Sequence, residues 1–424
     1  MPKGKRKLDH ILTDATEKEI FGGNILESLI REEAATVVFV PHAGRSKAIK
    51  YIADKSKEIG FERLGNYKIV LIDWEKMMST NPGEIFKIMV SELEIEELGG
   101  EDYLKIFNNL EKKIVKLVGE GIHLIFIFKQ WERAEYPIQF FNNLVYLWRL
   151  DKTRIHYVFA SNQSLVVDDK LNKYGKLAEL VCANIVYYPL FGGDDREVVI
   201  QELAGKYKYV ASNKQKDIIS RISGGHPFLI KLGLRESVWL KDDSEAKWYK
   251  FFAESWEINK AFKDIWEVMP ADDKRTVGQV ANGEAISYGK VSEYLKGLRL
   301  VNEAAGKAVL FSEAFGNFLR NRKIEGGNEL SVNQESGEIA VNGERVSDNF
   351  SLTEHKLLIF LIGVKNQVVT REKVAEILWG KDSYEKYSDW AMDKALYNLR
   401  KKLEKIGCRD KLQAIRRRGY RLIN

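Results

Sequence analysis

The stretches that decide the fold of the carboxy-terminal region are Leu352-Thr-Glu-His-Lys-Leu-Leu358 and Ile415-Arg-Arg-Arg-Gly-Tyr-Arg-Leu422. Apolar residues recur at helical spacing through the first stretch, which predicts a helix. Short apolar runs lie before it, around Asn342-Gly343, a pair that suits a type I′ hairpin turn. Thr370 is expected to cap a second helix, and the spacing predicts a third helix over residues 389–405.

The third predicted helix has one apolar face and several polar ones. The apolar face holds Met392, Leu396, Leu399 and Leu403. The other faces carry Lys394, Tyr397, Asn398, Arg400, Lys401 and Lys402. Cationic and amide side chains of this kind suit contact with phosphates and base edges in a major groove. Arg416, Arg417 and Arg418 follow on a hairpin tip, where three guanidinium groups repel one another unless an anion lies between them.

This series of elements resembles the OmpR/PhoB-type winged-helix DNA-binding domain over residues 330–424. By position, the resemblance implies DNA contacts from Lys394, Asn398, Arg400 and Arg416. The full set of candidate DNA-binding residues is Thr370, Arg371, Lys394, Tyr397, Asn398, Arg400, Lys401, Arg416, Arg417 and Arg418. Departures from the family stand at Trp390, Ala391 and Ala395, where polar, basic or contact residues are common, so the target sequence stays open.

Composition indicates an ordinary water-soluble chain of two to four domains, with 424 residues and a net charge of +6. Its two cysteines, Cys182 and Cys408, suggest neither a disulfide framework nor a zinc site. No apolar run reaches membrane-spanning length and no signal peptide is recognisable. We expect a cytoplasmic protein with no membrane partner.

Four short apolar runs in the front half alternate with helical patterns. They lie at residues 36–40, 68–73, 123–128 and 156–160. Such runs are typical of buried parallel strands with helices on both faces, so we predict a three-layer α/β domain. Asp73, at the end of the second run, has no evident partner and is expected to cap the strand end.

The first run leads into Pro41-His-Ala-Gly-Arg-Ser46, at the place of the P-loop motif G-x-x-x-x-G-K-[ST]. Gly44, Arg45 and Ser46 match its last three positions, with arginine in place of lysine, while Phe39 stands at the first glycine. Lys129 and Gln130 follow the third run, where acidic groups would hold magnesium and orient water. Arg45 and Lys129 therefore disfavour ATP hydrolysis, and we assign no catalytic residue and no metal site.

Later landmarks resemble the AAA+/STAND group of signalling ATPases. Ala160-Ser-Asn-Gln163 lies at the place of a polar sensor, Tyr188-Pro-Leu190 precedes a helical lid, and Ser223-Gly-Gly-His-Pro-Phe-Leu229 is similar to the glycine-histidine-proline motif of the lid. The resemblance implies nucleotide contacts from Gly44, Arg45, Ser46 and His226, with no certain cofactor and ATP or ADP possible. His226 is equally compatible with a structural role.

The middle of the chain, residues 256–320, is predicted to be helical with a hairpin whose wing is 302–308, and it resembles the winged-helix module that often follows AAA+/STAND cores. The predicted domains are 1–185 (degenerate P-loop NTPase-like), 186–250 (lid), 251–322 (winged-helix-like), 323–329 (linker) and 330–424 (DNA-binding). The fold class is α/β, a three-layer parallel-sheet AAA+/STAND-like core with a helical lid, followed by two winged-helix (α+β) domains.

The leading functional hypothesis is a transcriptional regulator that binds double-stranded DNA, with a non-hydrolysing body that senses a ligand or protein partner or forms a homo-oligomer. One alternative is an active STAND ATPase switch that couples nucleotide exchange to DNA binding. Another is an adaptor whose winged helices contact proteins. No receiver pattern is visible, so control by phosphorylation is not expected.

Overall fold

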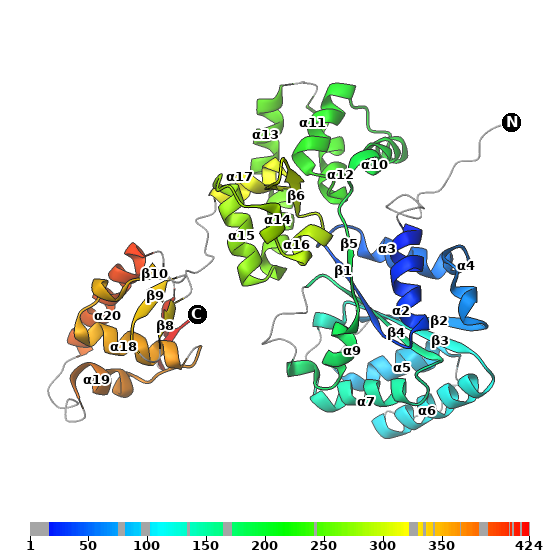
Figure 1. Ribbon diagram of the computed structural model, residues 1–424, viewed down its shortest axis with the longest axis horizontal. Coiled ribbons are helices and arrows are strands. Elements are labelled where there is room, and N and C mark those ends of the chain that lie inside the picture. The colour runs from blue at the N-terminus through cyan, green and yellow to red at the C-terminus, as the bar shows by residue number, and fades with distance from the viewer. Residues whose placement is uncertain are drawn as a thin grey trace. The chain divides into compact units, whose positions relative to one another are not determined.

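The computed structural model describes residues 17–74, 81–94, 102–133, 136–163, 172–240, 244–321, 330–333, 336–341, 344–364, 366–380, 389–406, 408, 411–415 and 418–423. The chain forms two compact units, Met1–Asn321 and Arg322–Asn424, which are drawn in Figure 1. The predicted linker 323–329, the Asn342-Gly343 turn, Arg416 and Arg417 lie outside the described residues. The finer domain boundaries within the first unit stay predictions.

A parallel five-stranded sheet is the centre of the first unit. Its strands are β1 (Ala35–Phe39), β2 (Tyr67–Asp73), β3 (His123–Lys129), β4 (Ile155–Ser161) and β5 (Ile185–Tyr188), in the order β2-β3-β4-β1-β5. Every residue of β1 and β4 is buried, as their continuous apolar runs predict. The α/β core is confirmed. The sequence did not reveal β5, which has four residues and only one of them fully buried.

Helices cover the sheet on both sides (Figure 1). They are η1 (Glu19–Leu26), α2 (Glu27–Ile30), α3 (Arg45–Asp54), α4 (Ser56–Ile59), η2 (Phe61–Leu64), α5 (Pro82–Glu92), α6 (Tyr103–Gly119), η4 (Trp131–Arg133), α7 (Ile138–Arg149), η5 (Asn172–Tyr174) and α9 (Leu177–Ala183). Asn81 and Asp102 cap α5 and α6 by accepting hydrogen bonds from first-turn amides. An aromatic-rich core lies between α5, α6, α7 and the sheet, including Phe86, Phe128 and Tyr157.

The remaining part of the first unit is mainly helical. It contains α10 (Gly193–Tyr207), α11 (Asn213–Ser223), α12 (Pro227–Glu236), α13 (Glu245–Glu254), α14 (Trp256–Val268), α15 (Ala271–Ala281), η6 (Tyr288–Lys290), α16 (Glu293–Gly297), β6 (Val301–Ala304), β7 (Lys307–Leu310) and α17 (Glu313–Asn321). The β6–β7 pair is an antiparallel hairpin at the place of the predicted wing. Gly225, in the turn before α12, has φ of +82°, and a Cβ there would lie 2.0 Å from the carbonyl oxygen of Phe191, so the turn requires glycine.

The second unit has the strand and helix order of a winged helix. Its elements are β8 (Leu330–Val332), β9 (Ile339–Val341), β10 (Glu344–Arg345), η7 (Ser347–Asn349), α18 (Leu352–Gly363), α19 (Arg371–Trp379), α20 (Asp389–Lys405), β11 (Leu412–Ile415) and β12 (Gly419–Leu422). β8, β9 and β10 form an antiparallel sheet, and β11 and β12 form a hairpin. The predicted third helix is confirmed as α20, and its predicted apolar face is buried.

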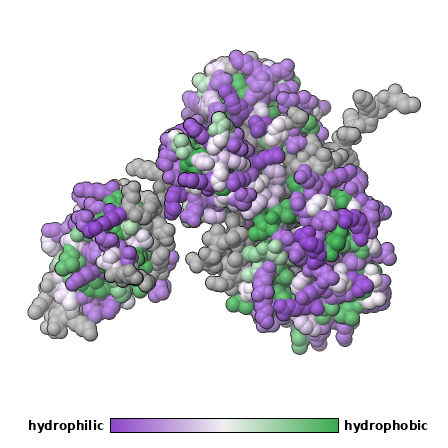
Figure 2. All heavy atoms as spheres, viewed as in Figure 1, coloured by the Kyte–Doolittle hydropathy of each residue, from purple (hydrophilic) through white to green (hydrophobic). Residues whose placement is uncertain are grey.

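The visible surface of each unit is mainly hydrophilic in Figure 2. Among the described residues, no helix has both the length and the apolar character needed to cross a membrane.

Candidate functional site

The outward face of α20 carries two large aromatic side chains and two lysines. Trp390 is 69% exposed and Tyr397 is 54% exposed. The Nζ atom of Lys394 lies 4.7 Å from the centre of the Trp390 ring, and that of Lys401 lies 5.0 Å from the centre of the Tyr397 ring. These positions are three or four residues apart, so the four side chains form one continuous stripe along the helix. We call Trp390, Lys394, Tyr397 and Lys401 the α20 stripe.

Two other cations of α20 are used inside the domain. Arg400 donates from Nε to the carbonyl oxygen of Leu412 in β11, at 3.0 Å. Lys402 pairs with Glu354 of α18, with 2.5 Å between Nζ and Oε2. Burial alone raises the pKa of Glu354, but hydrogen bonds from Lys402 and Ser351 lower it overall. These contacts hold α20 against the hairpin and the first helix.

A network of three side chains joins α19, α20 and β12. Arg371 donates to the Tyr420 hydroxyl at 2.8 Å and to Asp393 at 3.2 Å, and the same hydroxyl donates to Asp393 at 3.0 Å. Burial and the hydrogen bond to Asp393 raise the pKa of Tyr420. Thr370 caps α19, as predicted, by accepting from the Lys373 amide at 3.3 Å. The guanidinium of Arg371 thus positions the helix and hairpin.

The hairpin is seated tightly on the segment before α19. Val369 and Tyr420 exchange two backbone hydrogen bonds, of 2.7 and 2.8 Å. Gly419 has φ of +133°, and a Cβ at this residue would lie 2.0 Å from the carbonyl oxygen of Val369. Only glycine fits this position. Arg418 is exposed at the tip of the hairpin.

Of the ten predicted DNA-binding residues, the eight that the structure describes fall into two groups, and Arg416 and Arg417 lie outside the described residues. Lys394, Tyr397, Asn398, Lys401 and Arg418 are exposed. Thr370, Arg371 and Arg400 make contacts within the domain. Sequence reasoning noted Trp390 only as a departure from the family. Its exposure, which the sequence did not reveal, adds it to the candidates. Contact of any of these residues with DNA stays a prediction.

A second candidate site is a cavity of about 630 Å³ in the first unit. Its lining includes Gly44, Arg45, Ser46, Lys47, Glu132, Asn162 and Lys231. α3 starts at Arg45, directly after Gly44 in the left-handed region (φ +97°), and no side chain caps its first turn. Three of the four predicted nucleotide contacts thus line one cavity at a helix N-terminus.

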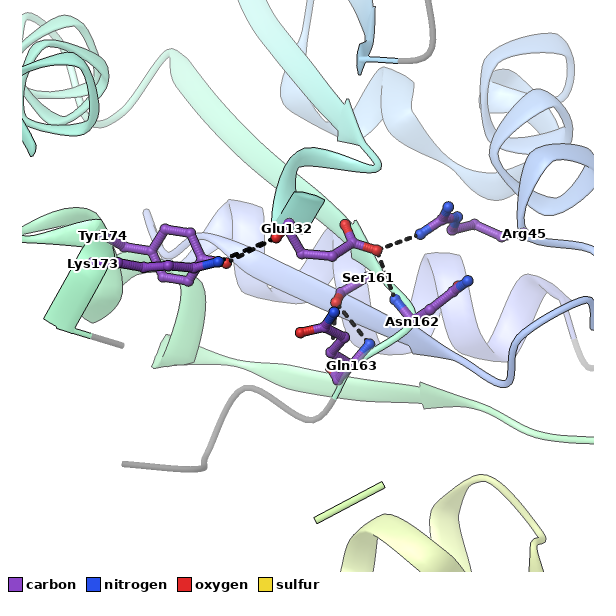
Figure 3. Close-up of polar contacts among 7 residues, drawn as sticks. All are labelled: Arg45, Glu132, Ser161, Asn162, Gln163, Lys173 and Tyr174. Carbon is purple, nitrogen blue, oxygen red and sulfur yellow. Dashed lines mark hydrogen bonds and ion pairs between the residues drawn. The ribbon is translucent and has the colours of Figure 1, made fainter. Parts of the chain in front are cut away.

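A buried ion pair joins the P-loop position to the segment after β3 (Figure 3). Arg45 Nη1 lies 2.8 Å from Glu132 Oε1, and the two residues are 8% and 4% exposed. The backbone N–H of Asn162 donates to the same oxygen at 3.2 Å. The carbonyl oxygen of Glu132 accepts from Lys173 and Tyr174 at 3.3 and 3.4 Å. Sequence reasoning missed Glu132, because it lies two residues beyond the place where an acidic group was sought.

Two acceptor oxygens beside this ion pair are buried without a hydrogen-bond partner among the described residues. They are Oε2 of Glu132 and Oδ1 of Asn162. Both residues line the cavity. Because an unsatisfied buried acceptor is unfavourable, a donor from a bound molecule would stabilise this wall.

A second ion pair joins side chains at the carboxyl ends of β2 and β3. Lys129 Nζ lies 2.9 Å from Asp73 Oδ2. The expectation that Asp73 has no partner was therefore wrong, because the sequence separation of the two strands concealed the contact. In the described ranges, no group of three or more His, Cys, Asp or Glu side chains is placed to hold a metal ion. Mg²⁺ prefers carboxylate and water oxygens. The carboxylates of Glu132 and Asp73 are already bound to Arg45 and Lys129. Magnesium nucleotide does not fit this donor set.

His226 is fully buried and is not part of the cavity lining. Its Nε2 atom lies 2.9 Å from the carbonyl oxygen of Pro41, so Nε2–H is the donor. Burial lowers the pKa of His226 to about 4. A neutral ring whose N–H is already engaged is poorly suited to a phosphate contact, which disfavours the nucleotide-binding role implied for His226.

Known proteins support the interpretation of the second unit. Residues 348–422 match the family model described as "Transcriptional regulatory protein, C terminal". The resemblance predicted for the last domain is confirmed. The response regulator ArlR of Staphylococcus haemolyticus (strain JCSC1435) is 29% identical over 93 residues, which are 22% of this chain and 41% of that protein. The chain therefore spans less than half of the length of this relative.

Solved structures similar to the chain include the ORC2 protein of Aeropyrum pernix and a Walker-type ATPase of Pyrococcus abyssi. Their TM-scores are 0.44 and 0.46, each with 12% sequence identity. Each alignment covers 76% of this chain, and 98% and 99% of the two structures.

Proposed function

We propose that this protein is a transcriptional regulator that binds duplex DNA through α20 and the β11–β12 hairpin of its last domain. The observation that carries the proposal is the α20 stripe. Its two lysines, Lys394 and Lys401, are exposed on the same helix as the exposed Asn398. Lysines at this place neutralise phosphates, and an asparagine amide can pair with adenine in the major groove. The internal contacts of Arg371, Arg400 and Lys402 hold the helix and hairpin in the geometry that such binding needs.

We further propose that Trp390 and Tyr397 contribute apolar contact area to the same surface. Tryptophan is seldom left so exposed in a folded domain unless it contacts another molecule. Apolar side chains can contact the methyl group of thymine. Trp390 then replaces a polar contact of the family by an apolar one.

The first unit is proposed to regulate this binding without hydrolysing ATP. Arg45 and Lys129, which stand at the places of catalytic groups, are both neutralised by carboxylates of the chain. The role proposed for this unit is to sense a ligand or to form an oligomer. The proposal as a whole includes a cytoplasmic location, where a DNA-binding regulator meets its target.

The test is recovery of bound sequences from randomised duplex DNA by the full-length protein at two salt concentrations. We expect one enriched motif. The variant Lys394→Ala/Lys401→Ala should bind that motif at least about tenfold more weakly, with a smaller salt dependence, because two phosphate contacts are lost. Lys356→Ala is the matched control, since Lys356 is an exposed lysine of α18. Binding that is unchanged in the double variant would exclude the α20 surface.

A further inference from the structure

The charges that line the cavity do not balance. Its three carboxylates are each paired with a cation: Glu132 with Arg45, Asp264 with Lys260, and Glu267 with Lys263. Lys47 of α3 and Lys231 of α12 also line the cavity. Neither lysine has an ion-pair partner within the part of the chain that the structure describes. The cavity therefore has a surplus of positive charge.

A third lysine, Lys206, lies with Lys231 over one aromatic ring but is not part of the cavity lining. Lys231 and Lys206 lie over the ring of Tyr207, with Nζ atoms 5.1 and 5.6 Å from its centre. The ring attracts the two ammonium groups but does not neutralise them. Partial burial, with repulsion from Lys206 and Lys231, lowers the pKa of Lys47. An anion between these groups would relieve the repulsion.

The first turn of α3 offers further stabilisation for an anion. Gly44 to Lys47 line the cavity, and no side chain caps the helix. The first amides of a helix carry a partial positive charge. In α3 the Lys47 N–H donates to the carbonyl oxygen of Gly44 at 2.9 Å, so the amides that an anion could meet are those of Arg45 and Ser46. Elsewhere the cavity wall needs hydrogen-bond donors instead of an anion. Oε2 of Glu132 and Oδ1 of Asn162 are buried acceptors without a donor among the described residues. A matching ligand thus has an anionic group and separate hydroxyl or amino donors.

We infer that this cavity binds a small phosphorylated molecule without magnesium, through Lys47, Lys231 and the start of α3, with donor groups directed to Glu132 and Asn162. The inference rests on the proposed sensing role of the first unit and names the class of ligand. It departs from a magnesium-nucleotide site because the carboxylates that would serve the metal are held by Arg45 and Lys129. A volume of about 630 Å³ suits a ligand the size of a nucleoside phosphate or sugar phosphate.

The experiment is isothermal titration calorimetry of the full-length protein with pyrophosphate, AMP, ribose 5-phosphate and uncharged ribose. Each titration is done in EDTA and again with magnesium. We expect the phosphorylated probes to bind in EDTA, ribose not to bind, and magnesium to tighten binding less than about twofold. Lys47→Ala and Lys231→Ala should each weaken binding about tenfold or more. Lys50→Ala, in the same helix but with its ammonium close to Asp54, is the matched control.

Three results would overturn the inference: no binding of pyrophosphate at millimolar concentration, binding only with magnesium, or equal binding by the lysine variants and wild type. The donor requirement is tested separately by Glu132→Gln, which supplies its own N–H group. We expect this variant to favour pyrophosphate over ribose 5-phosphate more than wild type does, and unchanged selectivity would contradict a role for Glu132. DNA selection without added ligand is measured on the same preparations, so failure of the cavity leaves the DNA-binding proposal intact.

Discussion

Arg45 and Lys394 occupy comparable positions in the two units but meet opposite environments. Each stands where the resembled family would place a residue facing phosphates. Arg45 is 8% exposed and bound to Glu132, whereas Lys394 is exposed and lies over Trp390. A cation at the expected place in the sequence is therefore available to a ligand only if the fold leaves it without a carboxylate partner.

The largest effect on stability is expected from removal of the Glu132 carboxylate. Glu132→Ala leaves the buried Arg45 guanidinium without its partner, so we expect a loss of about 3–5 kcal/mol in the free energy of unfolding. Urea denaturation of the full-length protein measures it. Arg45→Met/Glu132→Leu removes both charges and should recover most of the loss. Lys394→Ala, on the exposed side of the comparison, should change stability by less than about 0.5 kcal/mol. Equal effects of Glu132→Ala and Lys394→Ala would mean that Arg45 is not buried as described.

The hairpin of the second unit should respond next to a change in Gly419. Gly419→Ala places a methyl group against the Val369 carbonyl and strains a positive φ. We therefore expect the free energy of unfolding to fall by about 2–3 kcal/mol. Amide hydrogen exchange in β11 and β12 measures this loss. Gly363→Ala is the control, because a Cβ at Gly363 meets no atom within 4 Å. Slow exchange of the hairpin amides in Gly419→Ala would show that the hairpin does not need this close approach.

Acid should destabilise the first unit through His226. The pKa of this residue is about 4 in the folded protein and 6.5 ordinarily. Between these values the unfolded chain binds a proton that the folded chain does not, so stability falls as pH decreases from about 6.5 to 4. At pH 5 the loss from His226 is about 2 kcal/mol relative to pH 7. His226→Gln keeps a donor for Pro41 and should lack this part of the pH dependence. Denaturation at both pH values is the measurement, and an unchanged slope in the variant would contradict the buried neutral ring.

The neighbouring residues Lys401 and Lys402 show the same difference between an exposed and a paired cation within one helix. Lys401 is exposed, whereas Lys402 pairs with Glu354. Lys401→Ala should weaken DNA binding several-fold and reduce the salt slope by about one, with little change in stability. Lys402→Ala should lower the free energy of unfolding by about 1 kcal/mol and leave the salt slope nearly unchanged. Salt titrations of binding and urea denaturation of both variants measure the difference, and identical salt slopes would remove the distinction between the two lysines.

Local patterns in the sequence were enough to predict most elements. The apolar period of residues 389–405 predicted α20 with its buried face, and Thr370 predicted the start of α19. Continuous apolar runs predicted four strands of the parallel sheet. The fifth, β5, escaped because only one residue of Ile185–Tyr188 is fully buried, so its run lacks the strong apolar signal of the central strands.

Helix and strand periodicity depend on neighbours a few positions apart, so the sequence alone predicts which residue types lie on which elements. Which charges are paired depends instead on the tertiary fold. Arg45 and Glu132 are 87 residues apart, Lys402 and Glu354 are 48 apart, and Arg371 and Tyr420 are 49 apart. An ion pair or hydrogen bond forms over about 3 Å in space whatever the separation along the chain. Only the fold could therefore distinguish the cations that hold the protein together from those left for a phosphate.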